Sequence, residues 1–94
     1  MYGTVAKTVV KPENRSKLRE LFAGQIAQRK VPGYITSYML FENDSDAAWI
    51  FAVFEDRATY DANAGDPAQD AEYRMYRALM EAEPEWHDGE IESF

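Results

Sequence analysis

The chain has 94 residues, 46% of them hydrophobic, which suffices for one domain with its own core and argues against disorder. Its 17 acidic residues against 10 basic ones give a formal net charge of −7, which disfavours nucleic acid as a partner. Without cysteine or a long apolar segment, we expect a single cytoplasmic domain over residues 1–94 that forms no disulfide and contacts no membrane.

The first third of the chain predicts a strand followed by a helix. Tyr2 to Val10 is rich in β-branched residues and ends at Lys11-Pro12, which is typical of a strand. A helix is expected over residues 13–30, with Pro12 in its first turn and Val31-Pro32-Gly33 ending it. Four apolar side chains share one stripe of this helix: Leu18, Leu21, Phe22 and Ile26.

The middle of the chain predicts a β-hairpin. Residues 33–42 form a second strand, and the turn-forming run Asn43 to Asp46 joins it to a central strand over residues 47–54. The central strand is an unbroken apolar run, which is typical of a strand buried on both faces.

The last third predicts two helical segments and an edge strand. A short helical piece follows Asp56, and a longer helix begins with Asp66 as N-cap and Gln69 at the capping-box position. This helix is expected to end near Glu83, before Pro84, with an inner stripe made of Tyr73, Tyr76, Leu79 and Met80. Residues 85–94 have the mixed polarity of an edge strand.

The element order β-α-β-β-α-β predicts an α+β, ferredoxin-like fold with a four-stranded antiparallel sheet and helices on one face. The helices can cover only one face, yet both strands of the hairpin are apolar on both sides. On the second strand Tyr34, Tyr38 and Leu40 oppose Ile35, Met39 and Phe41, and on the central strand Trp49, Phe51 and Val53 oppose Ile50, Ala52 and Phe54. We therefore expect a homodimer in which two sheets pack face to face.

Four segments of the chain, taken in order, resemble the antibiotic biosynthesis monooxygenase family. They are VKPEN, VPGYITSYML, FAVFEDRATYDANAGDP and PEWHDGEIESF, and the resemblance covers essentially the whole chain. It implies a homodimeric α+β barrel. For many members it implies oxygen addition to electron-rich aromatic molecules, such as quinols or anthrones, with no metal or flavin cofactor.

The resemblance also suggests site residues. Tyr60 falls where some active members have a pocket tyrosine, and Arg74 lies near where they have a pocket arginine. Phe54 stands in place of the tryptophan that commonly ends this strand, and Asn63 in place of a histidine that many members carry.

Three side chains are the candidate catalytic groups, and each has a structural alternative. His87, the single histidine, has the pKa range of a base near neutral pH, but could equally lie on the edge strand beside Asp88 or Glu90. Tyr60 could orient a substrate hydroxyl or be an amphipathic core residue. Arg74 could stabilise an anion or pair with Asp70 on the helix surface.

The candidate substrate-binding residues are mostly aromatic and could line a site for a flat ligand: Trp49, Phe54, Asn63, Tyr73, Tyr76 and Trp86. The sequence therefore favours a cofactor-independent oxygenase for a small planar aromatic molecule. Two alternatives stay open: a non-catalytic ligand-binding or dimerisation module on the same scaffold, and an isomerase or lyase. No metal ligand set is recognisable, because the carboxylates at residues 81–85 have no histidine partner at a suitable spacing.

Overall fold

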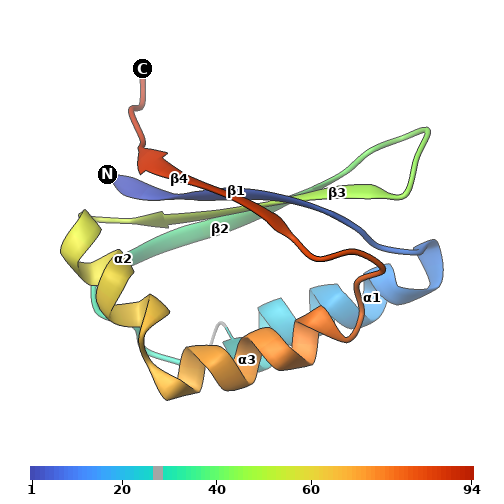
Figure 1. The fold of residues 1–94 in the computed structure, drawn as a ribbon, viewed down its shortest axis with the longest axis horizontal. Helices are drawn as coiled ribbons and strands as arrows, with labels where there is room; N and C mark the ends of the chain where they lie inside the picture. Colours follow the sequence, from blue (N-terminus) through green and yellow to red (C-terminus); the bar gives the residue numbers. More distant parts are fainter. Residues whose placement is uncertain (27–28) are drawn as a thin grey trace.

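The computed structural model describes residues 1–26 and 29–94, which form a four-stranded antiparallel sheet with helices on one face (Figure 1). The elements are β1 (Tyr2–Val9), α1 (Pro12–Leu21), the short π-helical segment η1 (Phe22–Ile26), β2 (Tyr34–Phe41), β3 (Ala47–Phe54), α2 (Arg57–Ala64), α3 (Pro67–Arg77) and β4 (Glu85–Glu90). The strand order is β2-β3-β1-β4. The expected α+β, ferredoxin-like fold is confirmed. No helix in the described ranges combines the length and the hydropathy needed to cross a membrane.

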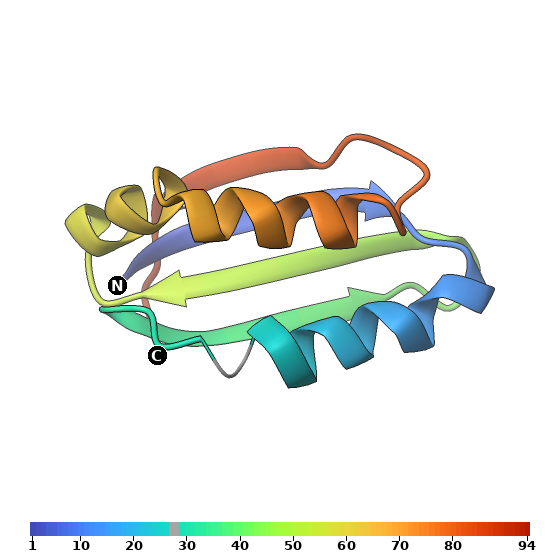
Figure 2. The same ribbon diagram turned by 90° about the horizontal axis from the view of Figure 1, so that it is seen from below.

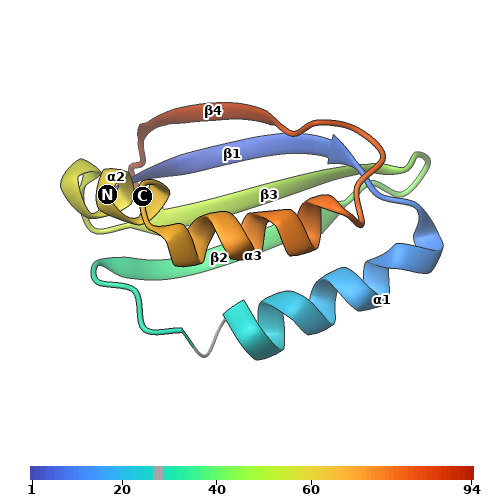
Figure 3. The same ribbon diagram turned by 60° about the horizontal axis from the view of Figure 1, so that its bottom comes forward.

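The two faces of the sheet have different surroundings. Seen from below, α1 and α3 run across the sheet on the same side, with α2 at one end (Figure 2; Figure 3). We call this side the inner face and the opposite side the outer face. Because β1 and β3 pair with Ala6 opposite Ile50, these two residues point inward, and their neighbours Val5 and Phe51 point outward.

The core lies between the inner face and the helices. Its buried residues come from the position just after β1, from α1, from β3, and from α3 with the turn that follows it: Val10, Leu18, Ala48, Ile50, Tyr76 and Met80. The stripe predicted for the first helix is confirmed for Leu18, Leu21 and Phe22. The side chain of Ile26 and residues 27–28 of the expected helix lie outside the described residues.

A β-bulge at the start of β2 changes which side chains share a face. The pairing steps from Tyr34 opposite Phe54 to Thr36 opposite Val53, so one extra residue is accommodated on β2. Gly33 makes this entry possible: its φ is +77°, and a Cβ there would lie within 2.6 Å of Thr59. The prediction that Tyr34 shares a face with Tyr38 and Leu40 is therefore wrong, because the simple alternation is interrupted.

Two predicted element ends are also wrong. The last long helix ends at Arg77 and not near Glu83, because the chain turns there and binds to β1. Glu81 donates its backbone N–H to the Val9 carbonyl at 2.8 Å, and the Thr8 hydroxyl donates to the Ala82 carbonyl at 2.6 Å. The last strand ends at Glu90, four residues earlier than expected.

Candidate functional site

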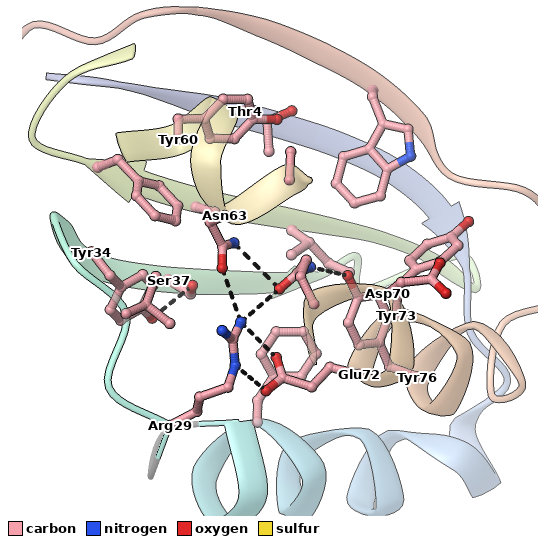
Figure 4. A pocket seen from close by; sticks show the side chains of 18 residues that line it. Thr4, Arg29, Tyr34, Ser37, Tyr60, Asn63, Asp70, Glu72, Tyr73 and Tyr76 are labelled. Atoms are coloured by element: carbon pink, nitrogen blue, oxygen red, sulfur yellow. Dashed lines mark hydrogen bonds and ion pairs between the residues drawn. The ribbon is translucent and has the colours of Figure 1, made fainter. Parts of the chain in front are cut away.

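A cavity of about 310 Å³ lies between the inner face and the helices α2 and α3 (Figure 4). Ligand pockets in proteins generally start at about 300 Å³, so the space suits a small molecule. Aromatic rings form much of its wall: Phe54 contacts Tyr34 edge-on with ring centres 5.6 Å apart, and Tyr60 at 5.5 Å. Asp56 places Tyr60 there, because its carboxylate caps α2 by accepting the backbone N–H of Thr59 at 2.9 Å.

One end of the cavity is built on an ion pair between Arg29 and Glu72. Glu72 is buried on α3, and both of its carboxylate oxygens accept from the Arg29 guanidinium, Oε1 from Nε and Oε2 from Nη2 at 3.2 Å. Asp66 adds a weaker attraction, with Oδ2 at 3.9 Å from Nη1. A buried carboxylate needs such a partner, so this pair fixes the guanidinium in the cavity wall.

Two amide side chains extend this ion pair across the cavity. Arg29 Nη2 donates to Asn63 Oδ1 at 2.9 Å and to Gln69 Oε1 at 3.1 Å (Figure 4). Asn63 Nδ2 donates to Gln69 Oε1 at 3.3 Å, and Gln69 Nε2 donates to the Tyr76 hydroxyl at 3.4 Å. Burial raises the pKa of Tyr76 to about 12. The network runs from a charged donor at Arg29 to a phenol at Tyr76.

Tyr60 connects the cavity to the edge of the sheet. Its hydroxyl donates to Asp88 Oδ1 on β4 at 2.9 Å. Burial first, and then this bond to a carboxylate, raise the pKa of Tyr60 to about 12. The phenol therefore keeps its proton at neutral pH, and its ring packs between Phe54 and Tyr2.

Six of the residues singled out from the sequence line this cavity: Phe54, Tyr60, Asn63, Tyr73, Tyr76 and Trp86. Tyr73 and Trp86 stand next to each other, with ring centres 6.1 Å apart. The rings of Tyr73 and Tyr76 leave space beneath them instead of filling it, so a small ligand has room there.

Three other singled-out residues lie elsewhere. Arg74 is 78% exposed on α3 and pairs with Asp70 at 2.9 Å, which is the surface alternative considered for it. His87 lies opposite Val5 and so belongs to the outer face, where its Nε2 is 3.0 Å from Glu85 Oε1.

Trp49 is also on the outer face. It pairs with Lys7 across the strands, and its indole donates to Glu42 at 2.7 Å. The structure thus places these three side chains away from the cavity of their own chain.

Sequence reasoning missed most of the polar groups of the cavity: Thr4, Arg29, Ser37, Gln69 and Glu72. The capping-box prediction for Gln69 is wrong, because Asp66 accepts the Ala68 N–H and the Gln69 side chain turns inward to Arg29. A signal was present: Gln69 and Glu72 precede Tyr76 by seven and four residues, which places them on its apolar stripe. Polar residues on such a stripe indicate a buried site.

Within the described residues, no cluster of three or more carboxylate and imidazole groups is arranged to hold a metal ion.

Solved structures with the same fold include several described as monooxygenases. A monooxygenase from the gene ActVA-Orf6 of Streptomyces coelicolor, in complex with the ligand nanaomycin D, superposes with a TM-score of 0.79 at 24% identity, covering 99% of this chain and 88% of that one. SnoaB, a cofactor-independent oxygenase from Streptomyces nogalater, gives 0.76 at 20% identity, with 99% and 94% covered. At such identities the likeness establishes the fold.

A third structure, from Chloroflexus aurantiacus, is described as a putative antibiotic biosynthesis monooxygenase and gives a TM-score of 0.73 at 22% identity, with 99% and 94% covered. Among curated proteins, no sequence match is significant. The model of the family described as antibiotic biosynthesis monooxygenase matches residues 1–72, which is most of the chain and includes β1 to α2 and half of α3. The chain therefore belongs to the antibiotic biosynthesis monooxygenase family.

Proposed function

We propose that the protein is a cofactor-independent monooxygenase that binds a small planar aromatic substrate, of the quinol or anthrone type, in the cavity beneath α2 and α3. The observation that carries this proposal is the cavity itself, because it combines a ligand-sized volume, aromatic walls and convergent polar groups in a chain of this family. SnoaB, which shares the fold, is described as cofactor-independent.

The reaction needs a substrate that reduces O₂ once deprotonated. An anthrone-type ring methylene loses a proton to give an enolate, which transfers electrons to O₂ and forms a carbon–oxygen bond. The resulting hydroperoxide loses water, so that CH₂ + O₂ gives C=O + H₂O. The carbon is oxidised, one oxygen atom enters the product, and the other leaves as water with both hydrogens.

The side chains of the cavity assist the proton and charge movements of this reaction. Tyr60 accepts the proton that the ring methylene loses while its own proton moves to Asp88 Oδ1, 2.9 Å away at the surface. The polar network anchored by Arg29 stabilises the negative charge that develops on the substrate. In this proposal Arg29 replaces Arg74 as the cavity arginine.

Oxygen uptake with a panel of quinols and anthrones tests the proposal. We expect Tyr60→Phe and Asp88→Asn each to lower kcat by about 10²-fold, the lower end for general acid–base groups. Arg74→Ala, which changes an exposed side chain outside the cavity, is the matched control and should keep kcat unchanged. If the wild-type protein never exceeds the uncatalysed rate, the oxygenase proposal fails.

A ligand-binding module without catalysis is the second candidate. It is supported by the position of His87, the most obvious general base in the sequence, on the opposite face of the sheet from the cavity. Ligand binding without oxygen uptake or any anaerobic conversion identifies this function, whereas anaerobic conversion of the ligand identifies an isomerase or lyase.

We further propose that the outer face joins two copies of the chain. Large apolar side chains are exposed on it: Tyr38 is 62% and Leu40 50% exposed, and Phe51 lies beside them on β3. Each large apolar side chain left in water forgoes about 1.5–3 kcal/mol, and a second, identical sheet would cover all of them through a two-fold axis. A native mass equal to one chain at micromolar concentration would contradict the dimer.

A further inference from the structure

The tyrosines that line the cavity differ in what their hydroxyl groups can still do. There are four of them, and three donate their proton to an acceptor within 3.1 Å: Tyr34 to Ser37, Tyr60 to Asp88 and Tyr73 to Glu83. An ionised carboxylate only accepts hydrogen bonds, so the directions at Tyr60 and Tyr73 are fixed. In the cavity, the Tyr60 oxygen therefore offers lone pairs and no proton.

Tyr76 is the fourth of these tyrosines. The direction of its hydrogen bond to Gln69 follows from the contacts that Arg29 makes at the other end of the network. Arg29 is a donor only, so the Gln69 atom that lies 3.1 Å from its Nη2 must be the amide oxygen. Asn63 Nδ2 donates to the same oxygen at 3.3 Å. The Gln69 amide nitrogen is then the atom that faces Tyr76, and it donates to the hydroxyl oxygen at 3.4 Å.

Tyr76 is consequently an acceptor toward the protein, with a proton left to donate. In the part of the chain that the structure describes, this hydroxyl takes part in one hydrogen bond, as the acceptor from Gln69, and donates in none. The residue is only 5% exposed, and leaving a buried hydroxyl proton unpaired is unfavourable. Burial also raises the pKa of Tyr76 to about 12, so the proton is present at neutral pH.

We propose that Tyr76 is the hydrogen-bond donor and Tyr60 the hydrogen-bond acceptor for one bound ligand, an inference that rests on the cavity being the substrate site. The ligand is then a planar aromatic molecule with two oxygen functions, a carbonyl or oxyanion that accepts from Tyr76 and a hydroxyl that donates to Tyr60. This pattern favours hydroxylated anthrones over simple quinols, because a quinol carries hydroxyl groups only. Tyr76 then stabilises the enolate oxygen formed on deprotonation.

A matched panel of bicyclic probes separates the two contacts. Coumarin carries a carbonyl, 2-naphthol a hydroxyl, 7-hydroxycoumarin both and naphthalene neither. Binding is measured by fluorescence titration at a pH below that at which either hydroxyl ionises. For the wild-type protein we expect 7-hydroxycoumarin to bind most tightly, coumarin and 2-naphthol more weakly, and naphthalene most weakly.

Two variants test the direction of the network. Tyr76→Phe should weaken coumarin and 7-hydroxycoumarin about five- to tenfold, as expected for one hydrogen bond, and leave 2-naphthol unchanged. Gln69→Glu keeps the phenol but turns residue 69 into an acceptor, so Tyr76 donates to it, and the same carbonyl-selective loss should follow. Tyr60→Phe should instead weaken 2-naphthol and 7-hydroxycoumarin and leave coumarin unchanged.

The outcomes distinguish this inference from the proposed function. If the probes bind but Tyr76→Phe and Gln69→Glu weaken coumarin and 2-naphthol equally, the donor role of Tyr76 is wrong and the cavity remains the ligand site. If no probe binds the wild-type protein, the inference is overturned together with the cavity as a substrate site. If Tyr76→Phe and Gln69→Glu weaken only the binding of the probes that carry a carbonyl, and the wild-type protein takes up no oxygen, the inference is supported and only the oxygenase proposal fails. If Tyr76→Phe does not fold, the binding of the probes to Gln69→Glu alone tests the donor role of Tyr76.

Discussion

The two faces of the sheet are made from the same strands but differ in what covers them. On the inner face, Ile50 and Phe54 meet helices, and the remaining space is a cavity with a connected polar network at one end. On the outer face, Tyr38 and Phe51 carry similar apolar surface with no helix over it. The contrast teaches that hydrophobic patterning locates burial, whereas polar residues inserted into an apolar face locate chemistry.

Breaking the polar network should lower stability much more than breaking a surface ion pair on the same helix. Glu72→Ala leaves the Arg29 guanidinium without its carboxylate, which for a buried pair costs about 3–5 kcal/mol; we expect the lower end because Arg29 is 22% exposed. Asp70→Ala, on the same helix, removes the exposed partner of Arg74 and should cost less than about 1 kcal/mol. Urea unfolding at one fixed protein concentration measures both, and equal losses would show that the inner network contributes no more than a surface pair.

Substitutions at two neighbouring residues of β3 test the contributions of the two faces directly. Ile50→Ala opens a hole in the core and should lower the free energy of unfolding by about 2–5 kcal/mol. Phe51→Ala removes a ring from the outer face and should mainly weaken association, by about 1.5–3 kcal/mol for each buried ring. Sedimentation velocity over a dilution series measures association, and thermal unfolding measures stability, so together they separate the two effects. A Phe51→Ala protein that associates like the wild type removes the outer face as an interface.

The fold was predictable from sequence because each element carries its own local signal. The apolar run of β3, the helical stripe of α1 and the Asp66-Pro67 start of α3 need no knowledge of distant residues. The element order then allows few topologies. Six of the eighteen cavity residues followed as well; among them, Tyr73 and Tyr76 lie on the helical stripe that was predicted to face the core.

The rest of the site depends on contacts that no local pattern contains. Arg29 reaches Glu72 across 43 residues of sequence, and neither residue signals the other. The face on which His87 lies depends on the register of β4 against β1, where a shift of one residue reverses every side chain. The bulge beside Tyr34 reverses that side chain in the same way.

The smallest expected effect concerns the ionisation of two inner-face tyrosines at alkaline pH: Tyr60, which is half-buried, and Tyr76, which is buried. The ordinary tyrosine pKa of 10.0 is raised to about 12 for both Tyr60 and Tyr76, chiefly by burial. A raised pKa in the folded state means that the unfolded chain loses these protons first. Their contribution to stability is therefore complete below pH 10 and is lost as the pH rises toward 12.

Absorbance at 295 nm during a pH titration follows tyrosine ionisation directly. We expect a late part of the absorbance change, near pH 12 or at the onset of unfolding, that becomes smaller in Tyr60→Phe and in Tyr76→Phe. In both variants the fall in stability between pH 10 and 12, followed by urea midpoints, should be shallower than in the wild type. If neither variant reduces this late part of the absorbance change, the hydroxyls of Tyr60 and Tyr76 are accessible to water. The inner face at the cavity would then not differ in solvent access from the exposed outer face.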